Sequence, residues 1–319
     1  WSLHGKAVGK FLRPISSKIL VHKVPDSEKA KSFSFYIAAI EQLSNFAKKA
    51  KPLLVSFGGG VIGDLGGFVA STYRRGVPYL NIPTTLLAQV DSAIGGKVAL
   101  DIKKAKNIVG NFYQPQQVLC DLRFLKTLPE KELRNGLVEV VKYGIISDRR
   151  LFSFLEKNLE KIIKRDWGSM EYIVARSCAI KARIVEKDEY DTRDIRAVLN
   201  FGHTIGHAIE AACRYSNAVP HGRAVALGMI MAGSISKELG LIGEKDCERM
   251  QALVGRINKG ARRLGHIRSG DVLEAISYDK KFVSGKNKFI LPRKIGSVKI
   301  VEGIPQNLIK KVVKRITEG

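Results

Sequence analysis

Residues 53–67 read Leu-Leu-Val-Ser-Phe-Gly-Gly-Gly-Val-Ile-Gly-Asp-Leu-Gly-Gly, an apolar run followed at once by a glycine-rich turn. The apolar run predicts a buried strand, and the glycines let the first backbone amides of the next helix approach a pyrophosphate group. Gly58, Gly60 and Gly63 satisfy the GxGxxG spacing of dinucleotide-binding domains, although an ordinary tight strand-to-helix turn explains this spacing about as well. The stretch therefore predicts an α/β unit with a candidate anion site at its first turn.

The chain changes character near residue 125. Before it, short apolar runs at 18–22, 53–57 and 79–83 alternate with helical segments, the pattern of a Rossmann-like parallel sheet. After it, apolar residues recur at helical spacing, with one short β-like piece at 287–292. We predict an α/β nucleotide-binding domain at 1–125 and an all-α metal- and substrate-binding domain at 126–319. The helices predicted in the second domain are 129–146, 149–164, 168–188, 202–214, 222–239 and 244–258.

Composition narrows the class of protein. The 319 residues are 45% hydrophobic, enough to bury a substantial core. The four cysteines are scattered without a CxxC pair, which favours a reducing, cytoplasmic location over a disulfide framework. No secretory signal is recognisable, and the most apolar stretch, 224–235, is too short to span a bilayer and predicts a buried helix.

The formal net charge of +24 favours phosphorylated substrates, nucleic acid or anionic membranes as partners, without choosing among them. The basic residues are spread over 103–106, 161–165, 256–268 and 309–315 and are not interleaved with aromatic residues. A solvated basic surface is therefore the favoured interpretation. Neither a nucleic-acid partner nor a membrane partner is predicted.

Three of the six histidines, His203, His207 and His221, fall within nineteen residues, which indicates a metal site. His203 and His207 are four apart, so on a helix they share one face about 6 Å apart along the axis, and His221 can fold back from the next loop. Neutral imidazoles with one added carboxylate suit zinc or a similar divalent ion. The alternative is a pair of satisfied core histidines. A protease-like HExxH motif is excluded because Thr204 occupies the position of the glutamate.

Further candidate residues flank these motifs. Glu139 and Lys142 are three apart in an apolar helical segment, where Glu139 suits the missing metal ligand and Lys142 an anion clamp; the alternative is an internal salt bridge. Asp91 and Lys97 lie among glycines after residues 83–85, and they suit a hydroxyl contact and a phosphate or carboxylate contact. The alternative for these two is an ordinary surface loop.

Several blocks taken in order resemble the 3-dehydroquinate synthase family, which shares its fold with metal-dependent polyol dehydrogenases. The resemblance covers about residues 25 to 303. The blocks are GGGVIGD, RRGVPYLNIPTTLLAQVDSAIGGK, KNIVGNFYQP, LKTLPEKELRNGLVEVVKYG, LNFGHTIGHAIEA and HGRAVALGM. One block alone is unspecific, whereas this many in register are very specific.

The resemblance implies roles for individual residues. The metal ligands would be Glu139, His203 and His221, binding zinc or cobalt. The NAD contacts would be Glu28, Lys31, Gly59, Gly60, Asp64, Thr84, Thr85 and Lys106. The catalytic residues would be His207, Lys142, Lys97 and Asn200. Substrate would also meet Asp91, Asn107, Lys181, Arg196 and one or both of Lys280 and Lys281, while Arg75 would reach the phosphate site of a neighbouring subunit in a homodimer.

The implied substrate is a small phosphorylated sugar acid, 3-deoxy-D-arabino-heptulosonate 7-phosphate, and the implied product is 3-dehydroquinate. In that reaction bound NAD takes a hydride and later returns it, phosphate leaves by elimination, and the opened ring closes by an intramolecular aldol step. NAD is regenerated in each turnover.

The chain departs from the family pattern in three places. It begins at Trp1, and the family's first strand and a second nucleotide strand with a Thr-Asp-x-Asn ribose contact are missing, so we expect an N-terminally truncated record of the NAD-binding domain. A natural protein without these strands would bind NAD weakly, because the acidic ribose contact would be absent. The loop at 188–196 is one residue longer than usual, so Arg193 competes with Arg196 for the substrate. Arg223 stands where the family commonly has glutamate, and this change alters what surrounds the metal ligands.

Three alternatives differ from this interpretation. A sister cyclase acting on sedoheptulose 7-phosphate or glucose 6-phosphate would keep the metal and NAD but usually changes the residues at Lys181, Arg196 and His207. A polyol dehydrogenase would release NADH and would not need so many phosphate contacts. A non-catalytic basic binding protein would explain the charge and the truncated cofactor half, but not the ordered site residues.

Overall fold

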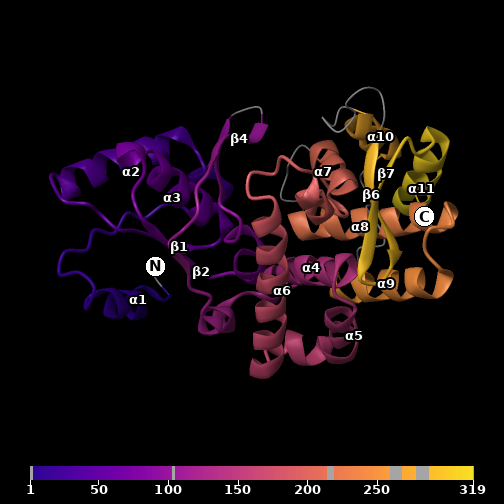
Figure 1. The fold of residues 1–319 in the computed structure, drawn as a ribbon, viewed down its shortest axis with the longest axis horizontal. Coiled ribbons are helices and arrows are strands. Elements are labelled where there is room, and N and C mark those ends of the chain that lie inside the picture. Colours follow the sequence, from indigo (N-terminus) through magenta and orange to yellow (C-terminus); the bar gives the residue numbers. More distant parts are fainter. Residues whose placement is uncertain (1–2, 103–104, 214–218, 259–267, 278–286, 319) are drawn as a thin grey trace. The chain divides into compact units, whose positions relative to one another are not determined.

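The structure is a computed structural model that describes residues 3–102, 105–213, 219–258, 268–277 and 287–318 (Figure 1). The chain divides into two compact units, Trp1–Leu128 and Pro129–Gly319. Among the described residues, no helix is both long and apolar enough to cross a membrane. The four cysteines are all free thiols.

A three-stranded parallel sheet forms the centre of the first unit. Its order is β1 (Leu54–Gly58), β2 (Tyr79–Pro83) and β5 (Gln117–Val118). The register pairs Leu54 with Tyr79 and Gly58 with Pro83, so β1 and β2 end at the same edge. The strands predicted at 53–57 and 79–83 are confirmed. The strand predicted at 18–22 is wrong, because these residues adopt no regular structure and their apolar side chains are largely exposed instead of packed in the sheet.

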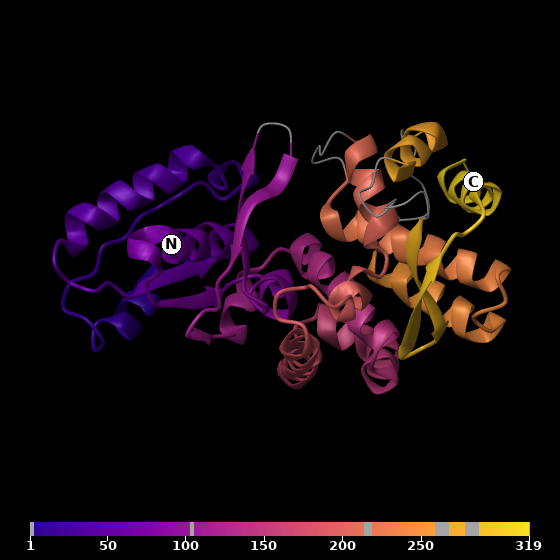
Figure 2. The same ribbon diagram turned by 45° about the horizontal axis from the view of Figure 1, so that its top comes forward.

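Helices cover both faces of this sheet (Figures 1 and 2). Successive side chains of β1 pack on opposite faces. On one face, Val55 and Phe57 pack with buried residues of α1 (Gly5–Leu12). On the other face, Leu54 packs with α3 (Gly60–Thr72), which α2 (Phe33–Ala47) covers in turn. This layering holds the start of α3 directly after the carboxyl end of β1.

An antiparallel hairpin of β3 (Lys97–Ile102) and β4 (Ala105–Phe112) packs against α3. The sequence did not predict this hairpin. Lys97 opens β3 directly after Gly95 and Gly96, whose φ angles of 108° and 68° explain the need for glycine. The remaining short elements of this unit are η1 (Glu28–Ala30), η2 (Tyr73–Arg75), the π-helix η3 (Ala88–Ser92) and η4 (Leu122–Thr127).

The second unit is built mainly of helices around α4 (Glu130–Ile146), whose residues from Gly136 to Ile146 are all buried. The six predicted helices are confirmed, with ends that differ by only a residue or two. The other helices of this unit are α5 (Arg149–Ile163), α6 (Trp167–Lys187), η5 (Ile195–Asn200), α7 (His203–Ala212), α8 (His221–Glu238), α9 (Glu244–Ile257), α10 (Ser269–Ser277) and α11 (Gln306–Glu318).

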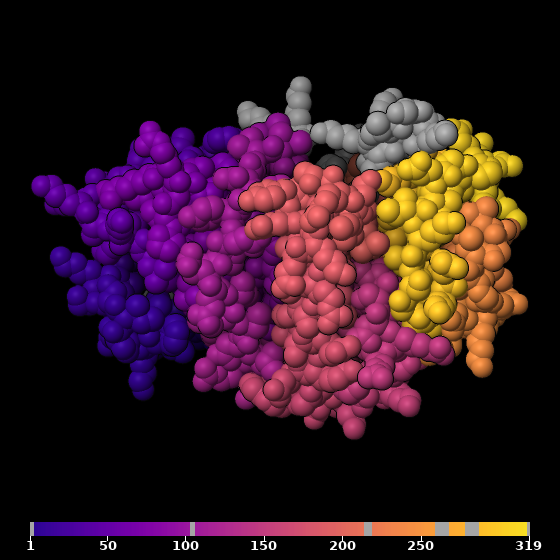
Figure 3. All heavy atoms as spheres, viewed as in Figure 1, coloured from indigo at the N-terminus to yellow at the C-terminus, as the bar shows by residue number. Residues whose placement is uncertain are grey.

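A second antiparallel hairpin, β6 (Lys288–Lys294) and β7 (Ser297–Glu302), belongs to this helical unit. The strand predicted at 287–292 is therefore confirmed, whereas its partner β7 was missed, so the unit is helical with one hairpin and not entirely α. In Figure 3 the yellow atoms of the C-terminal residues lie at the surface of this unit. The fold class is confirmed as an α/β unit with a parallel sheet followed by a helical unit.

Candidate metal centre and cofactor site

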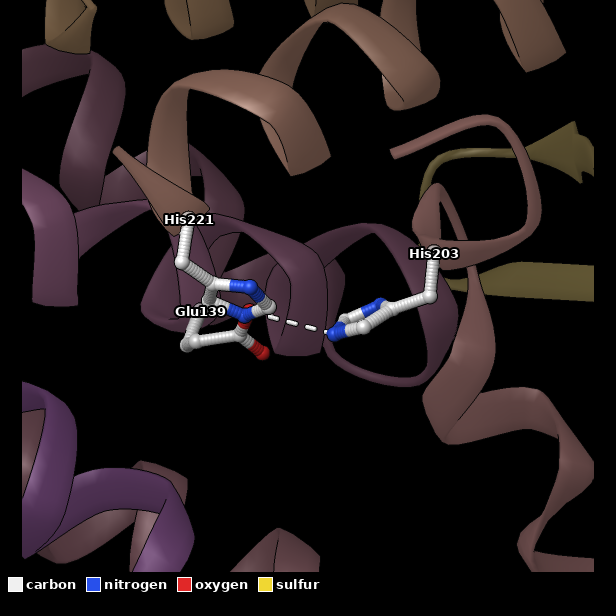
Figure 4. A group of neighbouring side chains, drawn as sticks. All are labelled: Glu139, His203 and His221. Atoms are coloured by element: carbon white, nitrogen blue, oxygen red, sulfur yellow. Dashed lines mark ion pairs between the residues drawn. The ribbon is translucent and has the colours of Figure 1, made fainter. Parts of the chain in front are cut away.

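Three helices bring together the three residues predicted as metal ligands (Figure 4). Glu139 lies in the buried part of α4, and His203 and His221 are the first residues of α7 and α8. Glu139 Oε1 lies 3.6 Å from His203 Nε2 and 3.9 Å from His221 Nε2. One ligand atom from each residue lies within 4.8 Å of the other two, a spacing that a single metal ion can bridge.

The outer ring nitrogens of the two histidines have partners of their own. His203 Nδ1 lies 3.2 Å from the carbonyl oxygen of Phe201, and His221 Nδ1 lies 3.2 Å from Glu210 Oε1. A proton on each Nδ1 donates to these oxygens and leaves the lone pair of each Nε2 directed at Glu139. In this tautomer Nε2 is available to ligate zinc or cobalt.

The electrostatics of the cluster also fit a divalent cation. Glu139 is 1% exposed, and among the described residues neither of its oxygens accepts a hydrogen bond. Glu139 also forms an ion pair with Lys142, so the internal salt bridge given as the alternative is present in the same residue that joins the candidate metal ligands. Burial, and then the nearby charge of Lys142, hold the pKa of His203 well below its usual range, which keeps this imidazole neutral and able to bind metal. The residues present therefore fit one zinc or cobalt ion.

Four more predicted site residues belong to this unit. The ring of His207 is exposed, and its centroid lies 5.4 Å from that of His203 and 6.4 Å from that of His221. Lys181 on α6 and Arg196 on η5 are both buried. Asn200 ends η5 and is half-buried. Buried cations of this kind suit an anionic substrate, because a low-dielectric surrounding strengthens their attraction to phosphate and carboxylate.

A buried carboxylate that the sequence interpretation did not single out organises the loop before Arg196. Asp188 Oδ1 accepts hydrogen bonds from the amides of Thr192 and Arg193, and Oδ2 accepts from those of Ile195 and Arg196, at 2.9 to 3.4 Å. Burial raises the pKa of Asp188, but these backbone donors lower it more, so the net shift is downward. The position of Asp188 at the end of the predicted helix was the only signal in the sequence.

The first unit gathers a second group of predicted residues at the carboxyl edge of its sheet. Gly59 is the N-cap of α3, which has no side-chain cap, and a Cβ on Gly59 would lie 3.4 Å from Thr85 Cγ2. A Cβ on Gly60 would come within 2.9 Å of Ser92 Oγ, and the amide of Thr84 donates to Gly58 O at 2.8 Å. An uncapped helix start lined by glycines and hydroxyls suits the pyrophosphate of a dinucleotide. The residues here fit NAD.

Three further residues of this unit meet around one buried ammonium. Lys31 Nζ donates to Asp64 Oδ2 at 2.6 Å and to the side-chain oxygen of Asn107. Burial raises the pKa of Asp64, and the charge of Lys31 opposes that shift. Asn107, whose φ is 55°, is therefore linked to two residues expected to contact NAD, although it was itself expected to contact substrate.

The other residues predicted to contact NAD or substrate lie in several different elements. Asp91 lies in the π-helix η3, and Lys97 Nζ lies 5.8 Å from the centroid of the Phe112 ring. Glu28 in η1, Arg75 in η2 and Lys106 in β4 are exposed. Lys280 and Lys281 lie outside the described residues.

Solved structures with the same fold define the class of protein. The chain aligns at TM-score 0.89 and 26% identity, over 99% of this chain and 88% of the other, with a 2-epi-5-epi-valiolone synthase from Streptomyces hygroscopicus subsp. jinggangensis 5008 with NAD+ and Zn2+ bound. It aligns at TM-score 0.85 and 25% identity, over 97% and 86%, with a 2-deoxy-scyllo-inosose synthase complexed with carbaglucose-6-phosphate, NAD+ and Co2+. The fold is that of the sugar-phosphate cyclases.

Sequence comparisons specify the family. The 3-dehydroquinate synthase N-terminal and C-terminal family models match residues 21–135 and 136–282. The chain is 41% identical to the 3-dehydroquinate synthase of Desulforamulus reducens, over 98% of this chain and 87% of that protein. It is 45% identical to that of Dictyoglomus thermophilum, over 91% and 81%. The chain belongs to the 3-dehydroquinate synthase family.

Proposed function

We propose that the chain is a lyase that converts 3-deoxy-D-arabino-heptulosonate 7-phosphate to 3-dehydroquinate and phosphate. The observation that carries the proposal is the convergence of Glu139, His203 and His221 from three helices, in a chain that belongs to the 3-dehydroquinate synthase family. This donor set suits zinc or cobalt, and the relatives of known fold carry one or the other together with NAD+.

When bound, NAD would accept and return a hydride, and the divalent metal would act as a Lewis acid on substrate oxygens. The chain's own residues would bind and orient the substrate. Lys142, Lys181 and Arg196 offer cations that are largely removed from water, which suits the substrate phosphate and carboxylate. Such cations stabilise the negative charge that develops as phosphate leaves.

His207 is proposed to move protons. It is exposed, and it follows the ligand His203 by one turn of α7, so its ring lies beside the metal centre without a place among the three ligands. An imidazole can accept a proton and then donate it again near neutral pH, which is what a general acid–base catalyst needs. Asn200 is proposed to orient a substrate hydroxyl through its amide.

In the first unit, the uncapped start of α3 at Gly59 and Gly60, with Thr84 and Thr85, would hold the NAD pyrophosphate. Glu28, Lys31, Asp64 and Lys106 would complete the NAD contacts, and Asp91, Lys97 and Asn107 would contact substrate. A homodimer in which Arg75 reaches the phosphate site of the neighbouring subunit, and a cytoplasmic location consistent with four free cysteines, complete the proposal.

The test uses the purified chain loaded with Zn²⁺ or Co²⁺, the heptulosonate phosphate and NAD. Phosphate release, 3-dehydroquinate formation and NADH absorbance are followed together. Equal amounts of product and phosphate without net NADH support the proposal, and chelation should abolish both. Net NADH accumulation would instead support a dehydrogenase.

A sister cyclase is the second candidate, because the aligned solved structures carry other synthase names. Sedoheptulose 7-phosphate and glucose 6-phosphate, assayed in parallel, separate the two. Turnover of either sugar without turnover of the heptulosonate would replace the primary proposal. The buried Lys181 and Arg196 favour the heptulosonate, because its carboxylate needs a cationic partner that the two sugars do not.

A further inference from the structure

The two histidines of the metal cluster are fixed in different ways. The ring of His203 bonds to a backbone carbonyl two residues earlier, and its side chain is 13% exposed. The side chain of His221 is 35% exposed, and its ring bonds to the side chain of Glu210. His203 is thus held by backbone next to it in the chain, whereas His221 contacts a side chain of another helix.

A second residue that contacts this part of the chain is Asn135. The amide of Gly222, the residue after His221, donates to Asn135 Oδ1 at 2.6 Å. The first N–H groups of a helix have no partner within the helix, and α8 has no side-chain cap of its own from its N-cap residue Pro220. Asn135 thus acts as a cap supplied by another helix, α4, and it fixes the backbone that carries His221.

The same contact couples His221 to the third ligand. Asn135 and Glu139 are four residues apart on α4, so they lie on one face of that helix. The first turn of α8 packs closely on this face, because a Cβ on Gly222 would come within 2.8 Å of the carbonyl oxygen of Asn135. One face of α4 therefore supplies a ligand and also sets the distance to the helix that supplies another.

We propose that Asn135 and Glu210 are positioning residues for His221, an inference that rests on the metal centre proposed above. Asn135 holds its backbone and Glu210 holds its ring, and together they set the metal affinity of the centre. Glu210 directs Nε2 at Glu139, and Asn135 keeps α8 at the required distance from α4. Neither residue touches the metal or substrate in this role.

The experiment measures the dissociation constant of Co²⁺, from its visible absorption bands and by competition with a chromophoric chelator, for the full chain and for Asn135→Ala, Asn135→Asp and Glu210→Ala. Loss of a partner around a metal ligand weakens metal binding by about 10- to 100-fold. Asn135→Ala and Glu210→Ala should fall in that range. Asn135→Asp keeps the acceptor oxygen and should restore the affinity to within a few-fold of the parent value. Lys131→Ala, an exposed change on the same helix, is the matched control.

Two further readouts separate positioning from general damage. The thermal midpoint without metal should fall by at most a few degrees, as expected for the loss of one helix cap or one side-chain hydrogen bond. The increase that Co²⁺ produces should shrink as well, because tighter binding gives a larger stabilisation of the fold. The Co²⁺ bands should also change in intensity as the ligand geometry relaxes. Unchanged affinity and spectra in folded Asn135→Ala and Glu210→Ala would overturn the inference. If Asn135→Ala does not fold, Glu210→Ala and Asn135→Asp decide it. Failure of the parent chain to bind Co²⁺ would instead contradict the metal centre itself.

Discussion

Lys142 and Glu139 form an ion pair on α4 in which the two side chains are only 2% and 1% exposed. Burying a carboxylate and an ammonium is costly, and the pair is tolerated because each charge compensates the other. A divalent ion held by Glu139 and the two histidines would place a second cation beside the same carboxylate. Lys142 therefore compensates the charge of the buried Glu139 side chain while the metal is absent and keeps a cation beside the candidate ligand.

Lys142→Met tests this relationship. Without metal, the variant leaves Glu139 buried without its cation, and we expect a loss of about 3–5 kcal/mol in the free energy of unfolding. Zn²⁺ should recover much of that loss, because the ion takes over the compensation of the carboxylate. Urea unfolding with and without Zn²⁺ measures both effects. Lys131→Met, on the exposed side of α4, is the control, and equal stability of the two apo variants would contradict the argument.

Lys31→Met tests the buried ammonium of the first unit. Lys31 is 4% exposed and bonds to Asp64 and Asn107, so its loss removes one partner from each. We expect NAD to bind about tenfold more weakly and the unit to lose about 2 kcal/mol, below the usual cost of breaking a buried pair because Asp64 is 22% exposed. NAD titration by protein fluorescence measures the affinity. The neighbouring exposed Lys29→Met should bind NAD as the parent does, and an equal loss in both variants would argue against a specific role.

Close packing of α3 on β1 gives a third prediction. A Cβ on Gly66 would overlap Ser56 Oγ and lie 3.1 Å from Ser56 Cβ. Gly66→Ala should therefore destabilise the chain by about 1–3 kcal/mol in spite of the better helix propensity of alanine. Ser56 Oγ has no hydrogen-bond partner among the described residues, so its removal has little cost of its own. The Ser56→Ala/Gly66→Ala double variant should recover most of the loss in thermal unfolding.

Gly9→Ala is the control for that prediction. Gly9 lies on α1 of the same unit, and a Cβ there would meet nothing within 4 Å. This change should stabilise the chain by about 0.4–1 kcal/mol, because alanine restricts the unfolded chain. If both glycine variants were stabilised, the close approach of α3 to β1 would not be the cause.

Sequence periodicity predicted the helices of the second unit well, because α4 to α9 are long and begin or end at recognisable Gly, Pro or Asp residues. The prediction of a strand at 18–22 was wrong, because an apolar run forms a buried strand only where a neighbouring strand pairs with it. The β3–β4 hairpin was missed because Gly95 and Gly96, directly before β3, indicate a loop and Gly110 interrupts the side-chain pattern of β4.

The three candidate ligands followed from residue types, spacing and family resemblance, and the structure brings them together. The residues that orient these ligands were not predicted from the sequence. Asn135 contacts Gly222 across 87 positions of sequence, and no local pattern reports such a contact. Glu210 lies two turns after His203 on α7, but its contact with His221 depends on how α7 and α8 pack. These contacts depend on tertiary packing. The sequence therefore predicts the candidate metal ligands but not the residues that orient them.

The loop before Arg196 provides the last prediction, because one carboxylate fixes four of its backbone amides. In Asp188→Asn, one of the two acceptor oxygens becomes an amide nitrogen, so the donors that faced Oδ1 or Oδ2 lose their partner. We expect the KM for the heptulosonate phosphate to rise by about tenfold, since small misplacements of a binding group cost up to ~10²-fold in rate. The value of kcat should change less if Arg196 mainly binds substrate. Thr192→Ala, which removes an exposed side chain of the same loop and keeps the amide that donates to Asp188, should leave KM near the parent value.

The stability of the same variant should also depend on pH in a defined direction. The folded pKa of Asp188 lies below its usual range, so its contribution to stability is present above the unfolded pKa of about 3.9 and is lost as pH falls through the lower folded pKa. Between neutral pH and about pH 5 the contribution is constant. The difference in stability between the parent and Asp188→Asn should therefore stay level over that range and shrink only under more acidic conditions, as measured by urea unfolding. A difference that grows on acidification would mean that Asp188 binds its proton more readily in the folded chain, contrary to its four amide donors.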